Sequence, residues 1–331
     1  MKKEKQETKK ETKQPREKRY GLLIVGTVLL IAGIILAVCT HNSSYKQSVE
    51  TGKELSTVKA QIKEIEEAQK AAEESGVENS ETTAVPAGDL AALKARSSEL
   101  SGKKLNQERP YSYSLALLFV AILFTLKGLV NAVIGVEKAA KPDVKRIAMA
   151  GLLAALCYIG FAFLKIDITV GTEKTAFHFG NVFCVLAALL LGGYWGGMAG
   201  AIGMTIGDLT TAYVTSAPKT FLLKFMIGLI VGFVAHKLFR LSKDHSAKFV
   251  ATATVVSCIC GMAFNIVADP LVGYFYKTYL LGVPQDLAKA LAKISAITTT
   301  VNAVVAVIAA SVFYLALRPA LKKSGMFVSN P

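Results

Sequence analysis

Seven polar side chains interrupt the apolar second half of this 331-residue chain, and they are the residues whose chemistry stands out. Polar and ionisable groups are costly inside a bilayer, so each one indicates a binding or transport site by default. A single asparagine near a helix end can equally well form an interhelical hydrogen bond, so the grouping matters more than any one member. The seven residues are His178, Asn181, Asp208, Lys224, Asn265, Asp269 and Asn302.

These residues do not form a recognisable catalytic arrangement. The sequence has no G-x-x-x-x-G-K-[ST] phosphate loop, no H-E-x-x-H and no G-x-S-x-G motif. Asp208 and Asp269 are flanked by GDLT and ADPL, which do not match the motifs of intramembrane aspartyl proteases. We therefore expect no catalytic residue, no metal, no cofactor and no enzyme activity.

The elements that position these residues are apolar runs. Hydrophobic residues make up 52% of the chain, and several runs approach the ~20 residues that span a bilayer as a helix. The sequence predicts an all-α membrane protein with a core of six transmembrane helices, preceded by two extra transmembrane helices and an extracellular helical hairpin. The predicted segments are a basic tail (1–20), a helix (21–40), the hairpin (41–110), a helix (111–136), the core (145–318) and a second tail (319–331).

The predicted hairpin has a coiled-coil-like pattern. Leu55, Val58, Ile62 and Ile65 follow a spacing of three and four residues, which is typical of a helical seam. A linker with Pro86 separates this helix from a second one. The hairpin could be a spacer, or it could be an arm for oligomerisation or docking.

The net charge of +14 is a topology signal. Nearly all of it lies in four segments that the span count assigns to one side: the two tails, residues 137–146 and residues 237–248. Cytoplasmic loops carry an excess of Lys and Arg, so both termini are predicted to be cytoplasmic. The expected partner of this basic surface is the lipid bilayer, and no nucleic acid is expected.

This orientation also gives the depth of the polar side chains. The asparagines, aspartates and lysine named above fall in the outer half of their helices, while the inner half is apolar and small. Such an asymmetry indicates a pocket open to the outside and not a polar path through the membrane. The segment from Lys165 to His178 is predicted to be a polar loop, either a simple connector or a lid that caps this pocket. Its two end residues, Lys165 and His178, are included among the predicted substrate-binding residues.

Four motifs then give the core a resemblance to a known family. They are HFGN (178–181), LAALLLGGYWGGMAGAIG (186–203), GDL (207–209) and APKTFLLKFMIGLIVG (217–232). From about Lys145 to Arg318 the chain resembles the substrate-binding S component of bacterial energy-coupling factor (ECF) vitamin transporters, in the branch labelled riboflavin-type. The front half is additional to that pattern.

The resemblance implies a function and partners. An S component binds a vitamin or vitamin precursor at the outer face of the bacterial cytoplasmic membrane. A transmembrane T component and two cytoplasmic ATPase subunits then drive uptake. The family's small-residue contact with the T component corresponds to Ala150 and Ala154 here. Two alternatives stay open: a membrane-anchored sensor or scaffold acting through the hairpin, and a stand-alone secondary carrier.

Overall fold

The computed structural model describes residues 16–75, 87–133, 143–170 and 173–327. The chain divides into two compact units, residues 1–42 with 114–141 and residues 43–113 with 142–331. Five stretches lie outside the described residues: most of the basic tail (1–15), the linker of the hairpin (76–86), the end of the predicted helix 111–136 with part of the basic segment after it (134–142), two residues of the predicted loop (171–172) and the chain end (328–331).

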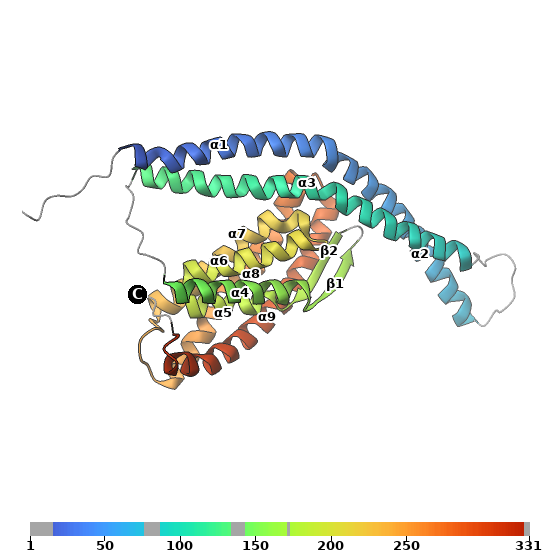
Figure 1. Cartoon of the computed structure of the whole chain (residues 1–331). Coiled ribbons are helices and arrows are strands. Elements are labelled where there is room, and N and C mark those ends of the chain that lie inside the picture. The colour runs from blue at the N-terminus through green and yellow to red at the C-terminus, as the bar shows by residue number, and fades with distance from the viewer. Residues whose placement is uncertain (1–15, 76–86, 134–142, 171–172, 328–331) are drawn as a thin grey trace, which may run out of the picture. The chain divides into compact units, whose positions relative to one another are not determined.

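The first unit pairs helix α1 (Arg16–Thr40) with the C-terminal part of helix α3 (Ala87–Val133), and the two run side by side (Figure 1). They approach closely because glycine lies at the contacts. A Cβ added to Gly26 would lie 2.7 Å from the Thr125 backbone. Small residues permit such close backbone contact between helices in lipid. Thr40 and Ser114 add a hydrogen bond of 2.9 Å between their hydroxyl oxygens.

The helices of the front half are longer than predicted. A π-helical turn, η2 (His41–Tyr45), carries α1 directly into helix α2 (Lys46–Ser75), and α3 continues through Pro110. The predicted boundaries at residues 40 and 110 therefore fall inside continuous helices. In the second unit, Leu55 and Val58 of α2 pack against Leu100 of α3, which is the seam expected from their spacing.

The second unit also holds six helices in the order expected for the core (Figure 1). They are α4 (Val144–Ala162), α5 (Gly180–Leu191), α6 (Gly193–Thr210), α7 (Ala217–Gly232), α8 (Ala247–Phe275) and α9 (Gln285–Lys323). Short turns extend three of the connections: η3 (Val214–Ser216), η4 (Phe233–Leu238) and η5 (Tyr276–Leu280).

The predicted polar loop between α4 and α5 is instead a small sheet, and the loop prediction was wrong. Strand β1 (Lys165–Val170) pairs antiparallel with strand β2 (Glu173–His178), and Lys165 lies opposite His178. The β-branched residues of β1, such as Ile166, Ile168 and Thr169, favour an extended backbone. We call the end of the core that carries β1 and β2 the sheet end.

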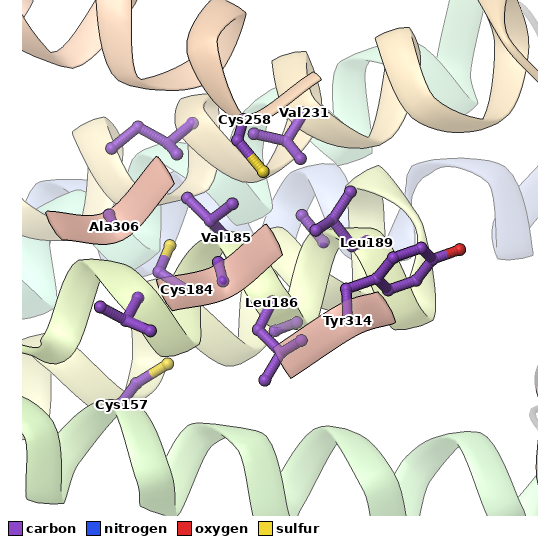
Figure 2. Packing of buried hydrophobic residues seen from close by; sticks show 14 of the residues in the cluster. Cys157, Cys184, Val185, Leu186, Leu189, Val231, Cys258, Ala306 and Tyr314 are labelled. Carbon is purple, nitrogen blue, oxygen red and sulfur yellow. The ribbon is translucent and has the colours of Figure 1, made fainter. Parts of the chain in front are cut away.

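Helix α5 forms the centre of the core. All but one of its residues are buried, because α4, α6, α7 and α9 pack around it. Its side chains Cys184, Val185 and Leu189 meet Val231 of α7 and Cys258 of α8 in a continuous apolar cluster (Figure 2). Burial on all sides explains why so short a helix is apolar throughout.

Two glycines allow close packing of α6 on α5 and of α7 on α6. A Cβ at Gly196 of α6 would overlap the backbone of Ala188 in α5, and a Cβ at Gly228 of α7 would overlap Gly197 in α6. Both positions therefore require glycine for the observed packing.

The chain is a multi-pass membrane protein by the length and composition of its helices. Within the described ranges, five helical stretches are long and apolar enough to cross a membrane, and α5 is a shorter apolar helix. The five are Gly21–Ala71, Val144–Ala162, Val214–Leu238, Ala247–Leu280 and Gln285–Lys323.

Candidate functional site

A cavity of about 100 Å³ lies at the sheet end, between β2 and the surrounding helices. Every predicted substrate-binding residue except Lys165 lines it, which brings together side chains from six elements. They are His178, Asn181, Asp208, Lys224, Asn265, Asp269 and Asn302. Phe161 and Met204 supply apolar wall. That these residues bind a substrate stays a prediction, but they do share one cavity.

Lys224 supplies a buried cation. Its side chain comes from the middle of α7 and is only 6% exposed. Its Nζ lies 3.5 Å from Oδ1 of Asn265 on α8, which is a long contact. Among the described residues no carboxylate forms an ion pair with Lys224. A buried ammonium with so little protein pairing is suited to a ligand acceptor.

Asp269 is already paired within the protein. Its Oδ1 lies 2.8 Å from Nζ of Lys219, and its Oδ2 accepts hydrogen bonds from Ser295 at 2.6 Å and Thr299 at 3.1 Å. These three donors satisfy the carboxylate. Asp269 therefore joins α7, α8 and α9 in the wall of the cavity.

Asn302 is also engaged by the protein. Its Oδ1 accepts the backbone N–H of His178, and its Nδ2 donates to the backbone carbonyl of Ala176, both at 3.0 Å. One amide thus holds the backbone of β2 against α9. Thr175 and Thr298 add a contact of 3.1 Å between their hydroxyl oxygens.

Three other polar atoms in this cavity are buried and have no hydrogen-bond partner within the described part of the chain. They are Nδ1 of His178, Oδ1 of Asn181 and Oδ2 of Asp208. Asn181 and Asp208 are each 1% exposed. Buried polar atoms are nearly always hydrogen-bonded in folded proteins, so this group needs a further partner.

His178 is neutral in this setting. Burial, with the nearby Lys224 charge as a further cause, lowers the pKa of His178 to about 3. Its ring lies edge-on to the Phe161 ring, with the centroids 4.9 Å apart. A neutral imidazole can donate or accept at Nδ1, depending on its tautomer.

Lys165 is the one predicted site residue that does not line the cavity, and it contacts Asp167 and Tyr213 instead. Its Nζ lies 3.0 Å from Oδ1 of Asp167 and 4.7 Å from the ring centre of Tyr213. The Tyr213 hydroxyl donates to the same Asp167 oxygen at 2.9 Å. Burial and this hydrogen bond raise the pKa of Tyr213, so it stays a donor. β1 is thereby tied to the segment that follows α6.

The predicted partner-contact residues lie on α4. Ala150 and Ala154 are half-buried and pack against the apolar core, and a Cβ at Gly203 of α6 would overlap the Ala154 carbonyl oxygen. The neighbouring pair, Gly151 and Ala155, is exposed. A Cβ added to Gly151 would meet no heavy atom of another described element within 4 Å. Gly151 and Ala155 therefore form the accessible small-residue surface of α4, next to the face that carries Ala150 and Ala154.

Sequence reasoning missed several lining residues of α9. Ser295, Thr298 and Thr299 precede Asn302 by seven, four and three positions, so all lie on one helical face with it. That spacing was the available signal. Lys219 also lines the cavity, and its pairing with Asp269 depends on tertiary contact.

The core thus has six helices and is closed at one end by a two-stranded sheet over a buried polar cavity. The family model described as "ECF-type riboflavin transporter, S component" matches residues 141–319, more than half of the chain. The chain belongs to this family of S components. Neither the comparison with curated proteins nor the comparison with solved structures gives a match.

Family membership defines the general role. The chain is a substrate-binding membrane component of an ECF transporter, and its family is one of transport components and not a class of enzymes. S components bind a small-molecule substrate and work with T and ATPase subunits.

Proposed function

We propose that this chain captures a vitamin or vitamin precursor at the extracellular face of the cell membrane, for ATP-driven uptake by partner subunits. The observation that carries the proposal is the set of buried polar groups in one cavity that the described residues leave partly unsatisfied: His178, Asn181, Asp208 and the weakly paired Lys224. A ligand that satisfies them would recover the cost of their burial.

The chemistry of these groups describes the ligand. Asp208 and Asn181 present oxygen acceptors, while Lys224 presents a donor with positive charge. The ligand therefore needs hydrogen-bond donors and acceptors close together. The pyrimidine-dione edge of riboflavin, with an N–H between two carbonyls, has that pattern. Because the matching family is described by riboflavin, we take it as the first ligand to test.

The size of the cavity supports a moving lid. Ligand pockets usually enclose roughly 300–1,000 Å³, and this cavity has about 100 Å³. A vitamin-sized molecule can enter only if a wall moves. The sheet is the wall that we propose moves, and its hydrogen bonds to other elements come from Asn302 and Thr298 on the β2 side and from Tyr213 on the β1 side.

The charge distribution supports an outward-facing sheet end. At the opposite end of the core, basic residues of α9 contact the connection between η4 and α8: Arg318 donates to the carbonyl of Leu241 at 3.0 Å, and Lys322 pairs with Asp244 at 2.6 Å. The positive-inside rule assigns that end, with both chain termini, to the cytoplasm. The T component and two ATPase subunits would then meet the core from the membrane and the cytoplasm.

Native mass spectrometry of the detergent-purified protein against a panel of B vitamins and precursors tests this proposal. We expect a one-to-one complex with one member, with riboflavin as the first candidate. If the folded protein binds none of them, the vitamin assignment is wrong, and a non-vitamin substrate or the scaffold alternative becomes the better account.

A further inference from the structure

The helical hairpin of α2 and α3, which lies outside the family match, contacts the core within the second unit. Two tyrosines make this contact. The Tyr45 hydroxyl donates to the backbone carbonyl of Leu281, and the Tyr111 hydroxyl donates to that of Leu280 at 3.2 Å. Their rings lie 4.7 Å apart, and both side chains are buried. The pair thus binds two consecutive carbonyls of the connection between α8 and α9.

The contact also encloses space beside the substrate cavity. An outer cavity of about 210 Å³ has one wall from the hairpin, with Leu55, Lys104 and Glu108, and another from the core, with Lys174 and Thr215. The Lys104 and Glu108 side chains form an ion pair of 2.8 Å at this wall and are only 12% and 10% exposed. The hairpin side is therefore ordered by its own interactions.

The two cavities share a thin wall. Lys174 of β2 lines both of them. Thr215 lines the outer cavity, while its neighbour Ser216 lines the substrate cavity. The Tyr276 hydroxyl of η5 donates to the Thr215 carbonyl at 2.8 Å. The same short turn, η5, thus contacts this wall at its start and leads to the tyrosine-bound carbonyls at its end.

We propose that the α2–α3 hairpin is an outer gate for the substrate cavity, held closed by Tyr45 and Tyr111 on the α8–α9 connection. The identity of the substrate rests on the proposed function, whereas the contacts that hold the gate closed do not. When the two hydrogen bonds break, the hairpin leaves the core and the segment from Thr215 to Ser216 becomes accessible. The hairpin then controls how fast a ligand reaches and leaves the site.

The test measures access without any substrate. Ser216→Cys is introduced into the full chain in a Cys39→Ala background, because Cys39 is the exposed native thiol among the described cysteines. The rate of reaction with a charged maleimide is then compared between this protein and its Tyr45→Phe/Tyr111→Phe derivative. Phenylalanine keeps both rings and removes only the donors. The matched control is Tyr113→Phe, whose side chain is 43% exposed on the same helix.

We expect the double variant to react about tenfold faster or more, since each lost buried hydrogen bond shifts an equilibrium by about fivefold. Tyr111→Phe alone should give a smaller increase, and Tyr113→Phe none. Equal rates in the double variant and the control would overturn the gate. Faster labelling in a protein that binds no vitamin would retain the gate and reject only the vitamin assignment.

Discussion

The ammonium of Lys219 lies 2.8 Å from the carboxylate of Asp269, and the two side chains join α7 to α8 in the wall of the cavity. Ser295 and Thr299 of α9 complete the carboxylate's hydrogen bonds. This carboxylate differs from Oδ2 of Asp208 and Oδ1 of Asn181, which are buried with no hydrogen-bond partner among the described residues. The cavity therefore contains two kinds of polar group. Lys219 and Asp269 hold helices together, while Asp208 and Asn181 each have a buried oxygen with no hydrogen bond to the described residues.

Asp269→Asn should destabilise the folded protein by about 3 kcal/mol, because it leaves Lys219 with no opposite charge in a largely buried site. Thermal unfolding in detergent measures the effect. The matched control replaces both members, Lys219→Met with Asp269→Leu, and should recover much of the loss. If Asp269→Asn is as stable as the parent, the ion pair does not hold the helices.

Asn302→Leu should release β2 from α9, because both amide contacts to the strand backbone are lost. We expect amide hydrogen exchange in β2 to rise about tenfold or more, in keeping with the loss of two hydrogen bonds. Thr300→Leu, at an exposed position on the same helix, is the control. Unchanged exchange in β2 would mean that Asn302 does not hold the lid.

Gly151→Leu should prevent assembly with the T component while the isolated chain stays folded. Gly151 is exposed and has open space around it, so a larger side chain does not disturb the core. Co-purification with T and ATPase subunits measures assembly. Thr252→Leu, an exposed small position on α8, is the control. Normal assembly of the Gly151 variant would exclude this face of α4.

The pKa of His178 predicts a pH dependence. The unfolded chain protonates this histidine below its ordinary pKa of about 6.5, whereas the folded protein does so only near 3. Between these values the unfolded state binds more protons, so stability falls as the pH falls.

The melting temperature of the parent protein should therefore drop between about pH 7 and about pH 5, and His178→Gln should show a smaller drop. His245→Gln, at an exposed histidine, should behave like the parent. An identical drop in all three proteins would show that His178 is protonated at a similar pH in both states.

The grouping of the site residues could be predicted from the sequence because helix direction gives depth. Asn181 lies at the start of α5 and Asp208 near the end of the next helix, α6, which runs in the opposite direction, so both fall at the same end of the core. The division of roles could not be predicted. Asn302 bonds to the backbone of a strand and Asp269 pairs with a lysine, and both arrangements depend on atoms of other elements that come within bonding distance in the folded chain.

The structure differs from the sequence-based predictions in two further places, and each difference has a physical cause. The spacing of small residues on α4 fits either Ala150 with Ala154 or Gly151 with Ala155, and only the packing of α6 at Gly203 decides which pair is covered. The β1–β2 sheet was missed because two short strands next to long apolar helices give a weak signal, although the β-branched residues of β1 indicated an extended backbone.

The central claim is that the cavity at the sheet end binds the substrate, and Lys224→Met tests it most directly. With the ligand identified from the vitamin panel, titration of the purified variant should show an affinity about 10- to 100-fold weaker, because a charged hydrogen bond is lost. Lys289→Met, at an exposed lysine of α9, should bind as the parent does. Equal affinity in the folded Lys224 variant would contradict the assignment of this cavity.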